Sequence, residues 1–337
     1  MTLTEAYVKK SEFLDCITYS SDKEWLELRR EGIGGSDAAA AMGLSKYTSP
    51  LKLYKIKKGT CVEDLSDNPY VKKGKSLEPF IRETYVRPYL SGLGYELEHP
   101  ECMFVNKECP WLRANVDGIA FHKFDLDALP VIVEIKWVNE HSEGAWGGDR
   151  YCGIPVHYYA QVQHYMTVLK ARGAWVCALF DSDWTMHYFW VPYDHSFAVR
   201  LLADTKEFYC ENIIFNKEPE VTPHLDTTET LELVRKRKEH TVKSEDLVYD
   251  AEFDRLCADY VYAMSQIADL ENLKTVLKDQ LVKMHLKGII GSGEFVVSCR
   301  ERTTSSFDKK RFEEDHPDVL GNYTKTSSTT VTIIRRK

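Results

Sequence analysis

The chain has 337 residues, 43% of them hydrophobic and 12% aromatic, which is enough for one large domain or two ordinary ones and excludes a wholly disordered chain. Its formal net charge at pH 7 is −8, so any binding to a polyanion must come from local charge rather than from the total. Residues 1–22 show no apolar core after a basic start, and no apolar run approaches the roughly 20 residues that span a bilayer. We therefore expect a soluble intracellular protein without a membrane partner.

The first third of the chain is predicted to be helical. A short amphipathic helix over 22–32 is followed by a glycine-rich turn, in which Ser36 is placed to cap a small helix over 38–42. Further helices are expected over 51–58 and 77–90. The segment 46–87 contains ten basic and five acidic residues, a net +5 that suits either phosphate binding or an ordinary solvated helix surface.

Strand signals begin at Tyr95 and then alternate with helical ones. Strands are predicted over 103–105, 114–121, 131–137, 174–180 and 186–191, and helices over 154–170 and 197–214. This order predicts an α/β domain over 22–220, preceded by a separate N-terminal segment, 1–21.

The character of the chain changes after the proline-containing stretch 219–223. Charged helical runs over 228–240 and 247–286 follow, and the second has apolar residues at intervals of three to five, as in a helical hairpin or coiled coil. Short strands are expected at 294–299 and 330–334. Residues 221–337 are therefore predicted to form a C-terminal helical arm with short terminal strands.

The nine cysteines include no Cys-x-x-Cys pair, and their number is odd. This spacing argues against a structural zinc site, an iron–sulfur cluster and a disulfide framework. We expect reduced cysteines.

Two carboxylates and a lysine end adjacent strand-like runs. Asp117 precedes a glycine in Asn-Val-Asp-Gly, while Glu134 and Lys136 lie two apart in Val-Glu-Ile-Lys-Trp and so share one face of a strand. Carboxylates held by a sheet suit Mg²⁺, and a nearby lysine can orient or deprotonate water and neutralise charge on a phosphate. Taken alone, Glu-Ile-Lys is weak evidence for such a site and is better explained by a structural salt bridge.

Other residues make this set resemble the PD-(D/E)xK nuclease superfamily. The spacing from Asp117 to Glu134-x-Lys136 is similar, although the first acid stands in Val-Asp-Gly rather than Pro-Asp. Glu78 matches the acid that many of these nucleases carry on an upstream helix. Gln161, in the run from Tyr158 to Tyr165, matches the Gln-x-x-x-Tyr helix of their exonuclease branch.

The closer resemblance is to the phage recombination exonucleases of the lambda exonuclease and YqaJ-like type, over about 25–215. The run from Trp25 to Ser36 is similar to the N-terminal signature of that family, in which an arginine and a serine contact a terminal 5′-phosphate. The matching residues are Arg29 and Ser36. Gln163 matches a phosphate-contacting glutamine, and Asn115 replaces a serine that the family places two residues before the strand aspartate.

The resemblance implies a restriction-endonuclease-like core, a mixed central sheet flanked by helices, with a helical C-terminal extension. It also implies a Mg²⁺-dependent exonuclease that digests one strand of duplex DNA from its 5′ end and leaves 3′ tails for recombination. Two Mg²⁺ ions, for which Mn²⁺ can substitute, would be held by Glu78, Asp117, Glu134 and the Ile135 carbonyl, with Lys136 and Gln161 beside them.

The implied partners are double-stranded DNA ends and two further copies in a toroidal trimer. The coiled-coil-like spacing of the C-terminal arm indicates a further partner, a single-strand annealing protein. The implied location is the cytoplasm of a bacterium or of a phage-infected host cell. Two alternatives stay open: a structure-specific or restriction-type endonuclease on the same core, and a DNA-binding or assembly protein without catalysis. His141, His157 and His164 flank the site, and we expect them to be structural or surface residues.

Overall fold

The computed structural model describes residues 1–61, 68–125, 127–238 and 250–291, together with Val297, Cys299 and Phe312. The chain divides into two compact units, Met1–Thr230 and Leu231–Lys337. Every strand among the described residues, and every residue of the predicted site, lies in the first unit.

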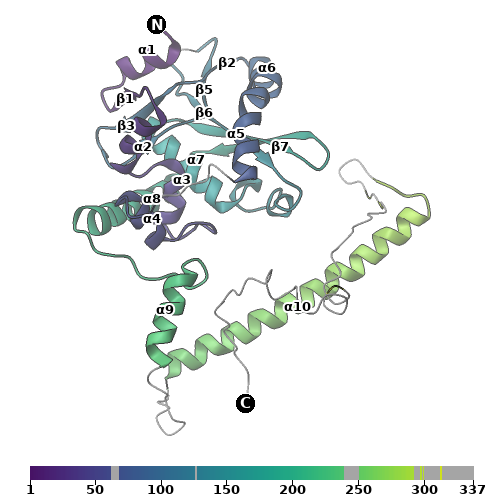
Figure 1. Cartoon of the computed structure of the whole chain (residues 1–337). Coiled ribbons are helices and arrows are strands. Elements are labelled where there is room, and N and C mark those ends of the chain that lie inside the picture. Colours follow the sequence, from purple (N-terminus) through teal and green to yellow (C-terminus); the bar gives the residue numbers. More distant parts are fainter. Residues whose placement is uncertain are drawn as a thin grey trace. The chain divides into compact units, whose positions relative to one another are not determined.

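A five-stranded mixed sheet forms the centre of the first unit (Figure 1). Its strands lie in the order β2-β5-β6-β7-β8, with β6 and β7 parallel and the other neighbours antiparallel. The strands are β2 (Tyr95–Glu98), β5 (Gly118–His122), β6 (Val131–Val138), β7 (Gly173–Phe180) and β8 (Thr185–Pro192). The bounds of β6, β7 and β8 agree with the sequence prediction to within one residue, and β2 begins at Tyr95, where the strand signals begin.

Helices cover both faces of this sheet. One face packs on α7 (Val156–Leu169), through Ile132 of β6 and its neighbours, while the other packs on the helical run α5 (Pro69–Ile81), η1 (Arg82–Val86) and α6 (Arg87–Gly92), through Val133 and Ile135. Because both faces are covered, β6 is apolar almost throughout; Glu134 is buried and Lys136 is partly buried. The fold class predicted from the sequence is confirmed.

A second, three-stranded sheet lies beside the first. It has the order β1-β3-β4 and consists of β1 (Leu14–Thr18), β3 (Cys102–Asn106) and β4 (Arg113–Ala114). The single strand expected over 114–121 is therefore wrong: β4 belongs to the small sheet and β5 to the large one. Asp117 lies at the change from one sheet to the other.

The N-terminal segment is built into this unit. Helix α1 (Leu3–Lys10) begins at a capping box between Thr2 and Glu5, and β1 pairs with β3 along five residues. The amides of Leu3 and Thr4 both donate to the Glu98 carboxylate of β2, each at 2.8 Å. Residues 1–21 are thus tied to both sheets.

Short helices surround the glycine-rich turn: α2 (Asp22–Arg30), α3 (Gly35–Ala41), α4 (Pro50–Lys57), and the run α8 (His195–Glu207) with η4 (Phe208–Ile214). The predicted cap is wrong. Gly34 is the N-cap of α3, and the Asp37 carboxylate accepts from its amide at 2.9 Å. Ser36 already lies inside the helix, and its hydroxyl accepts a hydrogen bond from Arg29 instead of capping the helix.

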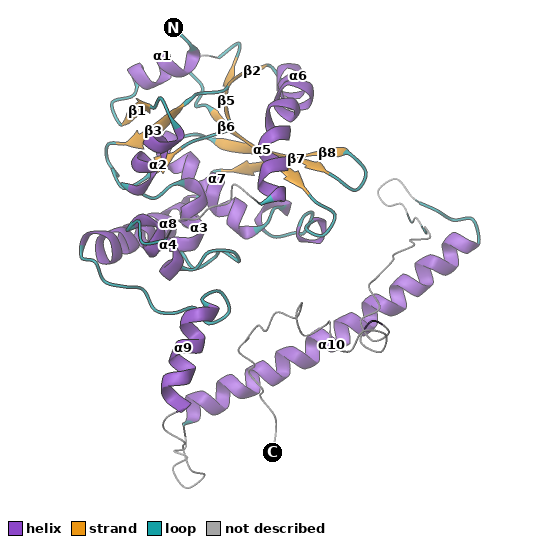
Figure 2. Cartoon of the chain, in the orientation of Figure 1, coloured by secondary structure: helices purple, strands orange, loops and turns teal. Residues whose placement is uncertain are grey.

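The helices predicted after residue 220 are confirmed as α9 (Thr227–Lys238) and α10 (Ala251–Leu286) (Figure 2). No residue of the 36-residue α10 is buried, and its apolar side chains, such as Leu256, Ile267 and Leu270, are exposed. The strand expected at 330–334 lies outside the described residues. So does the strand expected at 294–299, except for Val297 and Cys299. Within the described part of the chain, no helix combines the length and apolarity needed to cross a membrane.

Candidate active site

Asp117, Glu134 and Lys136 come together where β5 and β6 meet. One Asp117 carboxylate oxygen accepts from the backbone amide of Ile135 at 2.8 Å, which fixes this acid against β6. The Lys136 ammonium forms an ion pair with Glu134, two residues away on the same strand. The structural salt bridge considered from the sequence is therefore present, but with Asp117 beside it.

Glu134 is the most deeply buried acid of the site, with a relative exposure of 1%. Its Oε1 accepts from Gln161 Nε2 at 2.7 Å and from Lys136, whereas its buried Oε2 has no partner among the described residues. Gln161 Nε2 also lies 3.0 Å from the Tyr165 hydroxyl. Burial and the negative charge of Asp117 raise the pKa of Glu134 to about 8, against the opposing effect of Lys136.

Lys136 remains a cation in this setting. Burial alone would lower the pKa of its ammonium, but the negative charges of Glu134 and Asp117 outweigh burial and raise it. The ammonium also lies 4.8 Å from the centre of the Tyr158 ring. A lysine held in this way supplies positive charge and hydrogen-bond donors rather than a base.

Glu78 approaches from α5 and is paired with Arg82 on the next turn of the helix. Burial and the charge of Asp117 raise the pKa of Glu78, while Arg82 opposes the shift. The charge of Glu78 also contributes to the raised pKa of Glu134. The three acids therefore repel one another across the site.

This repulsion bears on whether a metal ion fits. Across the described residues, no three acidic, histidine or cysteine side chains stand close enough to hold a metal ion in their present positions. Instead, Lys136 forms an ion pair with Glu134, Arg82 forms one with Glu78, and the Ile135 amide donates to Asp117. The unpartnered Glu134 oxygen and the mutual repulsion nevertheless fit a divalent cation, which would favour the ionised carboxylates. Glu78 would join it only after leaving Arg82.

Arg29 and Ser36 are brought together at the end of α2 and the start of α3. The Arg29 guanidinium donates to the Ser36 hydroxyl at 2.6 Å and to the Asp37 carboxylate at 3.0 Å, and it lies 5.3 Å from the centre of the Trp25 ring. Ser36 is exposed. A guanidinium beside an exposed hydroxyl is a suitable site for a phosphate group.

Two residues behind Arg29 were missed by sequence reasoning. Lys57 is buried, and its ammonium donates to Asp37 at 2.6 Å and to the Arg29 carbonyl at 2.7 Å. Burial alone would raise the pKa of Asp37, but Lys57 and Arg29 hold it well below its usual range. The available signal was weak, because Lys57 lies in a lysine-rich helix that looks solvated.

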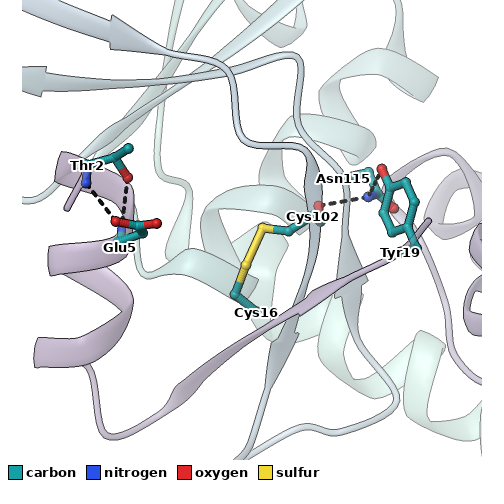
Figure 3. Close-up of a disulfide and its surroundings, with 6 residues drawn as sticks. All are labelled: Thr2, Glu5, Cys16, Tyr19, Cys102 and Asn115. Carbon is teal, nitrogen blue, oxygen red and sulfur yellow. Dashed lines mark hydrogen bonds between the residues drawn. A yellow bond between two sulfur atoms is a disulfide. The ribbon is translucent and has the colours of Figure 1, made fainter.

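Asn115 contacts Arg29 only indirectly, through Trp25. Its Oδ1 accepts from Trp25 Nε1 at 3.2 Å, and its Nδ2 donates to the Cys102 carbonyl at 2.9 Å and to the Tyr19 hydroxyl at 3.3 Å (Figure 3). Its amide is thus used to hold Trp25, the ring under Arg29.

Gln163 lies elsewhere. Its Nε2 donates to the Pro192 carbonyl at 2.9 Å, its Oε1 accepts from the Asp194 amide at 3.0 Å, and its side chain is fully buried. This geometry assigns Gln163 to the packing of α7 against the β8–α8 turn. Gln161 is the glutamine at the acidic cluster.

The flanking histidines are neutral or exposed. Burial, with Lys46 and Lys136 nearby, lowers the pKa of His157 to about 4, and burial likewise lowers that of His164 to about 4. The side chain of His141 is 73% exposed. These environments are those of structural and surface histidines.

The expectation of reduced cysteines is wrong for one pair. Cys16 of β1 and Cys102 of β3 form a disulfide with a Cα–Cα distance of 6.0 Å (Figure 3). Antiparallel pairing sets Cys16 opposite Phe104, which brings Cys102 to the diagonal position. A separation of 86 residues gives no local spacing from which the pair could be read. The other described cysteines are free.

Residues 24–172 match a family model described as the YqaJ-like viral recombinase domain. This segment is similar to that domain. It includes Arg29 and Ser36 as well as the acids, Lys136 and Gln161. The chain is also 25% identical over 321 residues to the uncharacterized protein YqaJ of Bacillus subtilis (strain 168), covering 92% of this chain and 93% of that protein.

Three solved structures also resemble part of this chain, each with a TM-score below 0.5. The alkaline exonuclease LHK-Exo from Laribacter hongkongensis is 18% identical, covers 65% of this chain and 100% of its own, and has a TM-score of 0.41. Its complex with dAMP is 17% identical at the same coverages, with a TM-score of 0.44. The structure of SSO0001 is 17% identical, covers 66% of this chain and 90% of its own, and has a TM-score of 0.29.

Proposed function

We propose that this protein is a Mg²⁺-dependent DNA exonuclease that digests one strand of linear duplex DNA from its 5′ end and leaves 3′ single-stranded tails for recombination. The observation that carries the proposal is the junction of β5 and β6, where Asp117 lies beside the ion pair of Glu134 and Lys136. There the buried Glu134 Oε2 has no partner among the described residues. The YqaJ-like recombinase match and the name of the exonuclease LHK-Exo support it.

In this proposal each group at the junction has one task. Asp117 and Glu134, with the Ile135 carbonyl and a released Glu78, would hold two Mg²⁺ ions, for which Mn²⁺ can substitute. Bound Mg²⁺ supplies Lewis acidity toward the scissile phosphate. The Lys136 ammonium orients the attacking water and neutralises the charge that develops on the phosphate oxygens. Gln161, hydrogen-bonded to Glu134, keeps that carboxylate in place.

The 5′ polarity comes from Arg29 and Ser36. Their donors would bind the terminal 5′-phosphate, with Asp37 and Lys57 behind Arg29 and Trp25 beneath it. An end that carries a phosphate would therefore be held while an internal phosphodiester of a closed duplex would not.

The decisive assay compares linear duplexes with 5′-phosphate and 5′-hydroxyl ends and a covalently closed circle, each with Mg²⁺ and with EDTA. We expect digestion of the linear duplexes only, faster from the phosphorylated end, and none in EDTA. Cutting of the closed circle would favour the endonuclease alternative. If Lys136→Ala and Asp117→Ala both digest DNA as fast as the wild type, the proposed site is wrong. If the wild-type protein digests no DNA at all, a non-catalytic role is favoured.

Two assembly proposals accompany this function: a trimer around DNA, and capture of a single-strand annealing protein by the exposed apolar residues of α10. Mass measurement in solution tests the first, and a monomer would contradict it. For the second, replacement of Ile267 and Leu270 by serine should abolish binding of an annealing protein without changing digestion. Unchanged binding would remove the idea.

A further inference from the structure

A cavity of about 410 Å³ lies between the start of α5 and the end of β6, outside the group of residues described above. Its lining includes Tyr70 and Lys73 of α5, Trp137 of β6, and Asn139 and Asp181 in the segments that follow β6 and β7. No task in the proposed hydrolysis uses these residues.

Aromatic rings form one side of the cavity. The rings of Tyr70 and Trp137 are nearly parallel, with an interplanar angle of 21° and centroids 6.2 Å apart. Tyr70 is 54% exposed, so much of its ring is open to solvent. Exposed aromatic faces of this kind are platforms on which unpaired bases stack, whatever their sequence.

The charges of the cavity favour a base over a phosphate. The Lys73 ammonium is already held 3.0 Å from the Asp181 carboxylate and 4.3 Å from the centre of the Trp137 ring. Glu140 adds a second acid to the lining. A phosphate would meet a lysine that Asp181 already neutralises and the further carboxylate of Glu140. A neutral base would meet the rings, with the Asn139 amide and the carboxylates available for its polar edge.

The cavity is close to the acidic site. Trp137 follows Lys136 directly in β6, and the two side chains point to opposite faces of the strand. Lys73 precedes Glu78 by five residues on α5, which is about 7.5 Å along a helix axis. If a DNA strand is bound at the acids, unpaired nucleotides next to the scissile one would therefore lie within reach of the cavity.

We propose that the cavity binds one unpaired nucleobase through stacking on Tyr70 and Trp137. This inference rests on the proposed function. The base could belong to the undigested strand or to the released nucleotide, since both offer the same chemistry. A bound base would hold the separated strand beside the site after each step.

The test measures binding of a labelled oligothymidylate to the full chain in EDTA, where no digestion takes place. Tyr70→Ala should weaken binding about 5-fold to 160-fold, as expected for the loss of one base–aromatic stack of roughly 1–3 kcal/mol. Tyr70→Phe, which keeps the ring, should bind as the wild type does. Phe124→Ala removes a ring that is 85% exposed on another part of the unit and should have no effect.

Equal binding by Tyr70→Ala and the wild-type protein would overturn the inference, as would an equal loss in Phe124→Ala. Competition by free dAMP, lost in Tyr70→Ala, would assign the cavity to the released nucleotide, and lack of competition would assign it to the strand. Glu134→Gln should bind the oligothymidylate normally but digest nothing. If the wild-type protein binds in this way without digesting any duplex, the proposed function fails and the base site stands.

Discussion

Gly35 lies directly against the ring of Tyr165. A Cβ atom on Gly35 would stand 2.8 Å from the Tyr165 hydroxyl oxygen and closer still to two ring carbons. Because that hydroxyl meets Gln161, which in turn donates to Glu134, this contact connects the start of α3 with the acidic site. The phosphate group proposed at Ser36 and the reacting phosphate are thus held at a set separation.

Substitution Gly35→Ala should damage both sites together. The added methyl group must push α3 away from α7, at a cost of about 1–3 kcal/mol for an overpacked core. We expect a lower melting temperature and loss of both digestion and the preference for 5′-phosphate. Gly74→Ala is the matched control, since nothing lies within 4 Å of its added methyl group. Normal digestion by Gly35→Ala would contradict the contact.

The buried pair of Asp37 and Lys57 should act through Arg29. Lys57→Met leaves the Asp37 charge without its buried partner, which typically costs about 3–5 kcal/mol of folding stability. The double variant Asp37→Asn with Lys57→Met removes both charges and should recover most of that stability.

The double variant should still lose the preference for 5′-phosphate over 5′-hydroxyl ends. The reason is that Arg29 loses the Asp37 carboxylate that binds its guanidinium and the Lys57 ammonium that binds its carbonyl. Melting curves and the ratio of digestion rates on the two ends measure the two effects separately. A double variant that retains the wild-type ratio would show that the pair is only structural.

Glu134 predicts a pH dependence for the metal-free protein. Its folded-state pKa of about 8 exceeds the ordinary value of 4.5, so its contribution to stability is full below pH 4.5 and is lost as the pH rises through 8. Glu134→Gln removes this dependence. In EDTA, the variant should therefore melt higher than the wild type at pH 8.5, with the gap closing toward pH 4.5. Identical melting profiles would rule out a buried, destabilised carboxylate.

The disulfide can be checked by peptide mapping. Proteolysis of the oxidised protein without reductant should yield the Cys16 and Cys102 peptides as one linked species, and reduction should separate them. Cys16→Ser should abolish this species, whereas Cys152→Ser, at an exposed free cysteine, should not. Free thiols at both positions under oxidising conditions would contradict the pairing.

The order of elements and the acidic cluster were predictable because they follow from local patterns. Alternation in β6 sets Glu134 and Lys136 on one face, and the apolar residues on the other face specify a sheet covered on both sides. Gln161 and Gln163 could not be separated in the same way. Most of α7 is buried, so its helical periodicity does not indicate which glutamine faces the acids.

The features that were missed depend on contacts between distant segments. Lys57 is buried because α2 and α3 close over it, and the disulfide exists because β1 pairs with β3. The division of 114–121 between two sheets has the same origin, since nothing within the run itself marks a change of partner. A hydrophobicity pattern describes one segment at a time and does not indicate which distant segments it contacts.

The position of Asp117 between the sheets makes the start of the chain a mechanical part of the site. β1 pairs with β3, and β3 pairs with β4. Three residues after β4, the Asp117 carboxylate accepts a hydrogen bond from the Ile135 amide of β6. Removing the first 20 residues, or attaching a bulky fusion that strains β1, would loosen that contact without touching any reacting group. A protein shortened in this way would be expected to fold around its large sheet yet align its carboxylates poorly.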